Sequence, residues 1–223
     1  MVTRHELLEA LHNILEPRGY LEIGVMHGDS LRLAQCRAYG IDPHPMPYGH
    51  FDGNQFTFVR QTSDEFFAHG VERVVDGPID LVFIDGMHLY EFALRDFANV
   101  ERYLANEKTV VVFDDVLPRN QEEAKREQCP GDWTGDVWKV FYILKDRRPD
   151  LHIQLVDTQP TGTLVVSSLT PGSTQLAQEY FNITNDWALQ NDETVPDAII
   201  NRTEAREPDD VLITLTFEKS ALE

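Results

Sequence analysis

Three aspartates and one histidine follow two apolar segments in the middle of the chain. Asp85 and His88 come directly after one apolar run, and Asp114 and Asp115 come directly after the next. A carboxylate that leaves an apolar segment is costly to bury unless it is hydrogen-bonded, caps a turn or holds a cation. Oxygen donors are the ligands that Mg²⁺ or Ca²⁺ prefers. We therefore predict that Asp85, Asp114 and Asp115 hold a divalent metal ion, with Mg²⁺ as the first choice.

Simpler structural roles stay open for each of these side chains. Asp85 could cap the turn that follows it, and adjacent residues of an extended chain point to opposite sides, so at least one of Asp114 and Asp115 is expected to be structural. His88 could be an ordinary surface histidine. An imidazole has an intrinsic pKa of about 6.5, which suits a general base near neutral pH. We predict His88 and Asp85 as the catalytic residues.

A second candidate site is the glycine-containing turn within residues 20–31. Tyr20 opens an apolar strand that runs into Gly24 and Gly28, where the backbone can approach a ligand closely. Asp29 or Ser30 is then placed to cap a helix whose free N–H groups would attract an anion. A plain strand–turn–helix without a ligand is the alternative.

The acids around this turn indicate which cofactor would bind. Asp42 stands eighteen positions after Gly24, at the end of a second apolar run. In a doubly wound sheet, such an acid can accept both hydroxyls of a ribose. A nicotinamide site expects Gly-x-Gly-x-x-Gly, whereas this chain has Glu22 two residues before Gly24, where a pyrophosphate would be repelled. The sequence therefore predicts a cofactor with a ribose, and this cofactor need not be a dinucleotide.

The elements that must position these residues alternate between helix and strand. A capping box at 3–6 opens an amphipathic helix, and further helices are expected after the capping box at 62–65 and over 90–104 and 137–145. Uninterrupted apolar runs predict strands that are buried on both faces. Strands are expected at 20–25, up to 41, and at 56–60, 79–84, 109–113, 151–156 and 163–167. The pattern predicts an α/β, doubly wound, mostly parallel sheet closed by an antiparallel hairpin.

Composition and charge restrict the partners and the location. The 223 residues, 42% of them hydrophobic, are enough for one sizeable core. Two cysteines suit a reducing compartment, and no run approaches the ~20 apolar residues of a membrane span. We expect a cytoplasmic protein that does not bind membranes. A net charge of −19, from 38 acidic and 19 basic residues, would repel phosphate backbones, so nucleic acid is not an expected partner.

The alternating pattern ends near residue 168. We predict a cofactor-binding domain over 1–168 and a C-terminal extension over 169–223, which contains a polar stretch at 182–194. The last apolar run, 211–217, alternates imperfectly and is expected to add an edge strand. This strand would join the sheet of the same chain or that of a second copy in a homodimer. A flexible tail on the domain surface is the alternative.

Taken together, these motifs resemble a known family. They are Glu-x-Gly-Val-x-x-Gly-x-Ser-Leu, the acid at 42, Thr-Ser-Asp-Glu, Ile-Asp-Gly-x-His-x-Tyr and Phe-Asp-Asp-Val. They are similar to class I S-adenosylmethionine (SAM) methyltransferases, in the clan of the macrocin-type sugar O-methyltransferases and the cephamycin-associated methyltransferase. The resemblance covers about residues 18–168 and implies a seven-stranded, Rossmann-like sheet. Met26 departs from it, because the usual motif has a glycine there.

The resemblance also implies which residues bind SAM and metal. Glu22, Gly24 and Gly28 would lie near the methionine part of SAM, Asp42 on the ribose, and Ser63 and Asp64 near the adenine. The full set of implied SAM contacts is Glu22, Gly24, Val25, Met26, Gly28, Ser30, Asp42, Ser63, Asp64 and Asp85. Asp85, Asp114 and Asp115 match the metal carboxylates of the sugar-modifying members. Those members have a second acid soon after the first aspartate, where this chain has Met87 and His88.

We therefore expect a SAM-dependent O-methyltransferase that acts on a hydroxylated small molecule, such as a sugar, a polyketide or another secondary metabolite, with help from a divalent metal. The long loop 116–136, which contains Trp133, is expected to close over the acceptor. One alternative is a metal-independent N- or carboxyl-methyltransferase with His88 as the base. Another is a SAM-binding module without catalysis.

Overall fold

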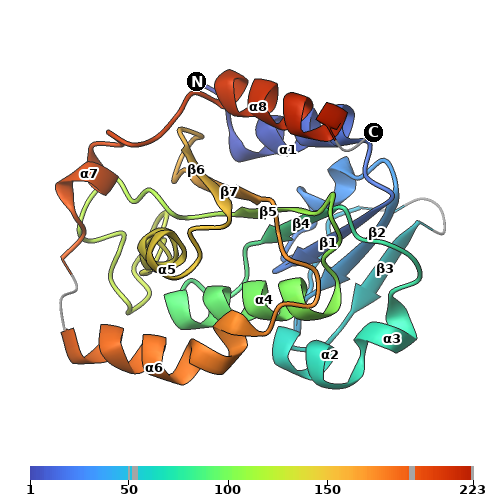
Figure 1. Ribbon diagram of the computed structural model, residues 1–223, viewed down its shortest axis with the longest axis horizontal. Coiled ribbons are helices and arrows are strands. Elements are labelled where there is room, and N and C mark those ends of the chain that lie inside the picture. The colour runs from blue at the N-terminus through green and yellow to red at the C-terminus, as the bar shows by residue number, and fades with distance from the viewer. Residues whose placement is uncertain (50, 52–54, 191–193, 222–223) are drawn as a thin grey trace.

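The computed structural model describes residues 1–49, 51, 55–190 and 194–221. A seven-stranded sheet lies between two helical layers (Figure 1). The strands are β1 (Gly19–Ile23), β2 (Arg37–Ile41), β3 (Phe56–Val59), β4 (Leu81–Ile84), β5 (Val110–Phe113), β6 (His152–Val156) and β7 (Thr163–Ser167). The helices are α1 (Arg4–Leu15), α2 (Ser63–His69), α3 (Val71–Val74), α4 (Tyr90–Tyr103), α5 (Lys139–Arg147), α6 (Gln175–Gln190), α7 (Asp197–Ile200) and α8 (Pro208–Ala221). Helices α1 and α8 cover one face, and α2, α4 and α5 cover the other.

The strand order is β3-β2-β1-β4-β5-β7-β6. The first five strands of this order are parallel, and β7 runs antiparallel to both β5 and β6. The predicted mostly parallel sheet with a closing hairpin is confirmed. The chain order reverses between β1 and β4, and ligands of open α/β sheets bind at the carboxyl ends of strands beside such a switch point.

The register aligns the ends of four strands. Ile23 at the end of β1 pairs with Ile41 of β2 and with Ile84 of β4, which in turn aligns with Phe113 of β5. The first residue after each of these strands is therefore at the same edge of the sheet. These residues are Gly24, Asp42, Asp85 and Asp114.

Both predicted capping boxes are present. Thr3 accepts a hydrogen bond from the backbone of Glu6 at the start of α1, and Thr62 does the same with Glu65 at the start of α2. Each box satisfies N–H groups that have no partner within the helix. The α2 box fixes the turn that carries Ser63.

The prediction of a helix directly after the glycine turn is wrong. The chain forms a single 3-10 turn at Leu31–Leu33, and Ser30 makes no side-chain cap to it. Only thirteen residues separate Ile23, at the end of β1, from Arg37, at the start of β2. The glycine turn uses the first of them, which leaves too little chain for a helix that could span the sheet.

The edge strand expected over 211–217 is also wrong, because these residues belong to helix α8. Pro208 stands at the helix start, where the N–H group that proline lacks is not needed. Two aspartates in the first turn interact favourably with the positive end of the helix dipole. Val211 and Leu215, one helical turn apart, are buried against α1. Part of the predicted polar stretch, 182–190, is helical in α6, and 191–193 lie outside the described residues.

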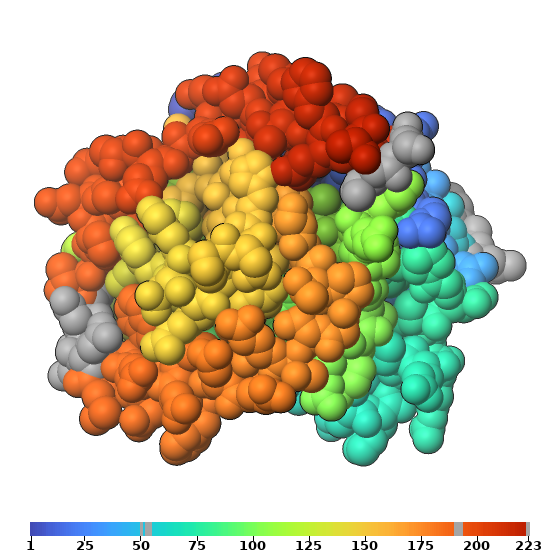
Figure 2. Space-filling view, in the orientation of Figure 1, coloured from blue at the N-terminus to red at the C-terminus, as the bar shows by residue number. Residues whose placement is uncertain are grey.

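The helices of the extension form continuous outer surface on two opposite edges of the molecule, as the space-filling view shows for 175–190 and 208–221 (Figure 2). Leu176 and Ile183 of α6 are buried against the main core. The extension therefore shares the core of the sheet domain. Association with a second copy remains a prediction.

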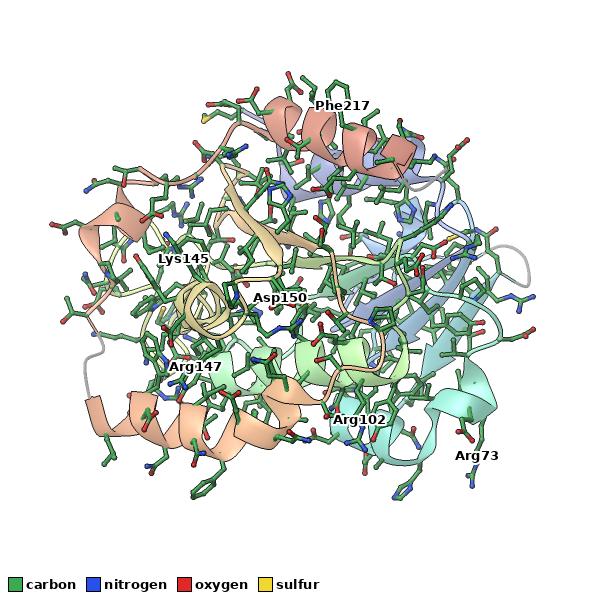
Figure 3. All side chains as sticks on the ribbon, in the orientation of Figure 1. Arg73, Arg102, Lys145, Arg147, Asp150 and Phe217 are labelled. Atoms are coloured by element: carbon green, nitrogen blue, oxygen red, sulfur yellow. The ribbon has the colours of Figure 1, made fainter. Side chains whose placement is uncertain are left out.

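A buried arginine connects three parts of the fold. Arg148, just after α5, is 1% exposed and pairs through Nη2 with Glu101 of α4 at 2.7 Å and with Asp150 at 2.7 Å. Glu101 also accepts a hydrogen bond from the backbone of Thr170. Arg147, the residue before Arg148, lies between α5 and α6, where it makes exposed ion pairs with Glu179 and Asp186 (Figure 3).

We predict that Arg148→Ala lowers the free energy of unfolding by about 3–5 kcal/mol, because it leaves the carboxylate of Glu101 buried without its cation. The matched control Arg147→Ala should cost at most about 1 kcal/mol, since its ion pairs are exposed. Urea unfolding of both variants measures the difference. Equal losses for the two arginines would contradict a special role for Arg148.

Candidate functional site

A cleft of about 550 Å³ lies at the carboxyl ends of the parallel strands. This size suits a cofactor or small ligand. Its walls come from the turns after β1, β2 and β4, from the starts of α1 and α2 and from one face of α4, with one residue from the turn after β5. The lining residues are Arg4, His5, Ile23, Gly24, Val25, Met26, His27, Gly28, Asp29, Ser30, Ile41, Asp42, Pro43, Thr62, Ser63, Asp64, Asp85, Gly86, Met87, His88, Phe92, Asp96 and Asp115.

The turn after β1 depends on a glycine. Gly24 has a φ of +89°, and a Cβ at this position would overlap the backbone carbonyl of Asp85. The turns after β1 and β4 therefore touch through their backbones. Met26, which replaces the middle glycine of the resemblance, also has a positive φ, of +43°. Its side chain is 60% exposed at the cleft.

Asp42 holds the glycine turn in place. One oxygen of its carboxylate accepts hydrogen bonds from the backbone N–H groups of Val25 at 3.0 Å and Met26 at 2.9 Å. The other oxygen accepts from the backbone of His44 at 2.7 Å. Each carboxylate oxygen has two lone pairs, so one lone pair of the oxygen that accepts from His44 remains for a ligand hydroxyl.

Glu22 lies behind the wall of the cleft and does not line it. Its side chain is fully buried and accepts hydrogen bonds from the hydroxyls of Tyr20 at 2.7 Å and Ser30 at 2.9 Å. The expectation that Glu22 contacts the cofactor is corrected, because its side chain points into the core beneath the turn. Burial raises the pKa of Glu22 to about 8. Ser30, which lines the cleft, connects Glu22 to the site.

Ser63 and Asp64 line the cleft at the end formed by the start of α2, and their contact with an adenine remains a prediction. Asp64 forms an ion pair with Arg95 at 2.6 Å. The sequence interpretation missed Asp96, which lines the same end and is 3% exposed. A sequence signal existed, because Asp96 interrupts the apolar face of α4 between Ala93 and Val100.

Asp85, His88 and Asp115 come together where the turns after β4 and β5 meet. His88 lies between the two carboxylates, with Nε2 at 3.4 Å from Asp85 and Nδ1 at 3.2 Å from Asp115. One ligand atom from each residue lies within 4.8 Å of the others, a spacing that could hold a metal ion. Two of the three predicted metal carboxylates therefore meet, together with a histidine that had been predicted only as a base.

Asp114 does not join this group. Its carboxylate is 1% exposed and pairs with Arg4 of α1 at 2.6 Å. The extended end of β5 turns neighbouring side chains to opposite sides, and Asp115 then leaves the strand with a φ of +62°. The predicted metal role of Asp114 is therefore corrected. Burial, Asp115 and Asp85 raise the pKa of Asp114, and Arg4 acts against them.

His88 is held from the loop that follows β5. Its Nδ1 lies 2.7 Å from the backbone oxygen of Trp133, and the two rings stack with centroids 5.1 Å apart. Burial lowers the pKa of His88, but the hydrogen bond to Asp85 and the charge of Asp115 outweigh it and raise this pKa to about 9. At neutral pH the imidazole therefore carries a proton, which disfavours the predicted role of His88 as the base.

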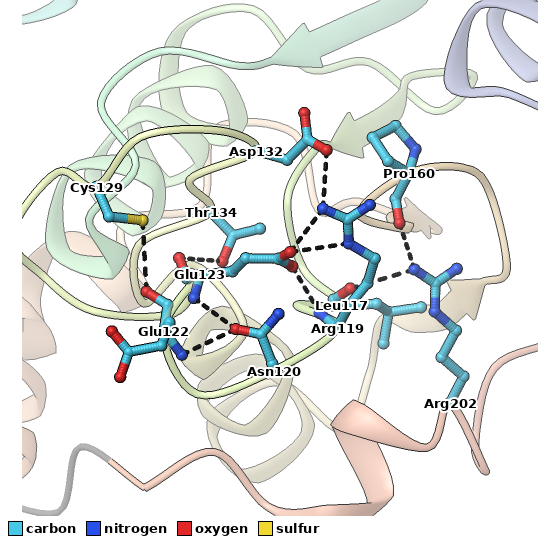
Figure 4. A network of polar contacts seen from close by, with 10 residues as sticks. All are labelled: Leu117, Arg119, Asn120, Glu122, Glu123, Cys129, Asp132, Thr134, Pro160 and Arg202. Carbon is cyan, nitrogen blue, oxygen red and sulfur yellow. Dashed lines mark hydrogen bonds and ion pairs between the residues drawn. The ribbon is translucent and has the colours of Figure 1, made fainter.

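The loop over 116–136 is braced by polar contacts (Figure 4). Arg119 donates to Glu123 at 2.6 Å and to Asp132 at 2.8 Å, and the hydroxyl of Thr134 donates to the backbone oxygen of Glu123. Asp132 and Thr134 flank Trp133, so the network fixes the residue that holds His88. Closure of this loop over an acceptor remains a prediction.

Comparisons with known proteins agree with this geometry. Residues 21–116 match the family model of a methyltransferase domain. An SAH-bound methyltransferase, PaMTH1 from Podospora anserina, is 14% identical over 75% of this chain and 80% of its own, with a TM-score of 0.55. The O-methyltransferase TomG from Streptomyces achromogenes, in complex with SAM, is 17% identical over 75% and 79%, with a TM-score of 0.53. MycE from the mycinamycin biosynthetic pathway, with Mg and SAH, is 19% identical over 74% and 48%, with a TM-score of 0.51.

The fold, with a cleft at the β1/β4 switch point, is that of the doubly wound α/β proteins, which bind ligands at this place in the sheet. The family model narrows this class: residues 21–116 are similar to a methyltransferase domain, and the sheet has the fold of SAH-bound methyltransferases. The resemblance found in the sequence is confirmed at this level. No curated protein matches the sequence. Among the described residues, no helix is long and apolar enough to cross a membrane.

We predict that Glu22→Gln changes how stability depends on pH. The pKa of Glu22 in the fold, about 8, lies above its ordinary value of 4.5. The stability linked to its proton is complete below about pH 4.5 and is lost as the pH rises through about 8. The glutamine side chain has no such proton. The free energy of unfolding of the variant should therefore rise relative to that of the wild type by up to a few kcal/mol between pH 5 and pH 9. Urea midpoints across this range measure the gain, and parallel profiles would refute it.

Proposed function

We propose that this protein is a SAM-dependent O-methyltransferase that acts on a hydroxylated small molecule with the help of a divalent metal ion. The observation that carries the proposal is the group of Asp85, His88 and Asp115 on the wall of the cofactor cleft. Binding of SAM alone does not require such a group. The O-methyltransferase TomG binds SAM, and MycE binds Mg and SAH, which supports the same chemistry here.

We assign SAM to the cleft from the residues that line it. Gly24 and Gly28 would face the methionine part, Asp42 the ribose, and Ser63 and Asp64 the adenine. Val25, Met26 and Ser30 complete the wall after β1. Glu22 contributes indirectly, because its hydrogen bond with Ser30 supports that wall.

The donor set fits a divalent cation. Asp85, Asp115 and His88 would hold the ion, which would displace a proton from the His88 imidazole. A bound metal would lower the pKa of a coordinated acceptor hydroxyl. The set contains one imidazole and two carboxylates, which differs from the three carboxylates expected from the sequence. Imidazole suits transition metals better than Mg²⁺, so Mn²⁺ is a candidate beside Mg²⁺.

The side chains then have separable roles in methyl transfer. In-line displacement requires the acceptor oxygen about 3 Å from the methyl group. In the metal-independent alternative, Asp85, whose side chain is 20% exposed, is the carboxylate best placed to accept the hydroxyl proton. Burial and Asp85 raise the pKa of Asp115 to about 6, and His88 acts against them, so Asp115 is largely ionised at neutral pH. Arg4 pairs with Asp114 on the far side, so Asp114 does not add its negative charge to the group of Asp85, His88 and Asp115.

The first prediction concerns the cofactor. Calorimetric titration should show binding of SAM and SAH, and Asp42→Ala should weaken both by about tenfold or more, because ribose hydrogen bonds and the turn are lost. Asp76→Ala is the matched control, since Asp76 is exposed and pairs with Arg37 at the opposite end of β2. Thermal unfolding of Asp42→Ala separates loss of contact from loss of fold. Binding of NAD in preference to SAM would overturn the assignment.

The second prediction concerns the metal. Titration with MgCl₂ and MnCl₂ should show binding that Asp115→Asn or His88→Ala weakens by about tenfold or more. The matched variant Asp114→Asn should change affinity less, because Asp114 pairs with Arg4. Removal of the metal from the wild type with a chelator should slow the formation of SAH when hydroxylated acceptors are supplied. Full turnover in excess chelator would leave only a metal-independent mechanism, and an unchanged rate in His88→Ala would limit His88 to a structural role.

A further inference from the structure

Asp115 has a backbone conformation that its surroundings must hold in place. Its φ of +62° lies in the left-handed region, which is costly for a residue with a side chain and persists only where neighbouring contacts fix it. On the strand side, the backbone N–H of Asp114 donates to the oxygen of Ile84 at 3.1 Å. The position of the Asp115 carboxylate beside His88 therefore also depends on what holds the chain after Asp115.

Leu117, two residues further on, is held through both polar groups of its backbone. Its N–H donates to the backbone oxygen of Thr161 at 2.7 Å, and its oxygen accepts from Nη2 of Arg202 at 3.4 Å. The side chain of Leu117 is fully buried. Two distant segments thus fix the turn after β5, namely the turn between β6 and β7 and the C-terminal extension.

Arg202 joins these two segments. It follows α7, and its side chain is 14% exposed. Its guanidinium points toward Leu117 and Pro160 (Figure 4), and it donates to the backbone oxygens of both and to that of Thr158 at 3.0 Å. It also pairs with the carboxylate of Asp157. A planar group with five N–H donors can bond several oxygens at once, whereas an ammonium cannot reproduce this geometry.

The turn between β6 and β7 also meets the start of α1. The backbone N–H of Arg4 donates to the oxygen of Gln159 at 3.3 Å, and the N–H of Gln159 donates to the oxygen of Val2 at 2.8 Å. The side chain of Arg4 pairs with Asp114. Arg202 therefore braces a turn whose contacts lead to both aspartates at the end of β5.

We propose that Arg202, from the C-terminal extension, is a positioning residue that holds Asp115 where its carboxylate can share a divalent cation with His88. This inference rests on the proposed function, because it assumes that the group of Asp85, His88 and Asp115 binds a metal ion. Arg202 acts through the backbone of Leu117 and through the turn between β6 and β7. In this role the extension supports the site without lining the cleft.

The experiment compares Arg202→Ala with the wild type. Electron paramagnetic resonance follows the titration of Mn²⁺, and calorimetry measures the affinity for SAH. The affinity for Mn²⁺ should fall about tenfold, the lower end of the range for residues that orient a metal ligand. Removal of a positive charge would by itself favour a bound cation, so the direction of the change separates positioning from charge. The affinity for SAH should stay within about threefold, since most of the cleft comes from the turns after β1, β2 and β4.

Two variants separate the bonds to the backbone from the ion pair. Asp157→Asn removes the ion pair of Arg202 and leaves its bonds to backbone oxygens, so the affinity for Mn²⁺ should change by less than about threefold. Arg202→Lys keeps the positive charge but loses the planar donor group, so the affinity should fall nearly as far as in Arg202→Ala. The lysine variant also provides the test if Arg202→Ala does not fold.

Arg148→Ala is the control for lost stability. Arg148 is buried against Glu101 of α4, and its loss should destabilise the fold and leave the affinity of the folded protein for Mn²⁺ unchanged. An unchanged affinity for Mn²⁺ in Arg202→Ala and Arg202→Lys, an equal loss in Arg148→Ala, or an equal loss of SAH affinity would overturn the proposal. Binding of Mn²⁺ by the wild type would still keep the proposed function in each case. Failure of the wild type to bind Mn²⁺ would overturn the metal-assisted function itself, and this inference with it.

Discussion

The contact between the backbones of Gly24 and Asp85 is the constraint on which the site depends. Because β1 and β4 are parallel and in register, their last residues lie side by side, and the turns that follow must share the space above them. Only a residue without a side chain fits at the first position after β1. This close approach places the glycine turn after β1 and the acidic turn after β4 on the two sides of one contact. Asp42 then fixes the turn from β2.

The charges of the site are balanced from outside the parallel strands. Arg4 comes from α1, His88 is held by the loop after β5, and together they offset the three aspartates after β4 and β5. The chain brings these cations from both directions along the sequence. A carboxylate group without them would be strongly self-repelling in a partly buried cleft. The remaining negative field suits a cofactor that carries a sulfonium cation.

Local patterns predicted much of the fold and the cleft. Apolar runs and capping boxes act over a few residues, so β1, β4, β5 and the starts of α1 and α2 could be read from the sequence. What could not be read depends on contacts between distant segments. The strand period does not say which of Asp114 and Asp115 faces the cleft, because the positive φ of Asp115 breaks the alternation. In α8, the positions of Val211 and Leu215 fit a strand as well as a helix. Their packing with α1 favours the helix, and this contact between distant segments is not visible in the local pattern.

The C-terminal extension has a physical link to the site. Helix α8 packs against α1 along one face of the sheet, and Lys219 of α8 donates to the backbone of Ile14 and to Glu16 at the end of α1 (Figure 1). Helix α1 begins with Arg4, whose guanidinium pairs with Asp114. The extension therefore helps to fix the helix that brings a positive charge to the acidic strand ends. Although none of the described residues of the extension lines the cleft, its packing bears on the electrostatics of the site.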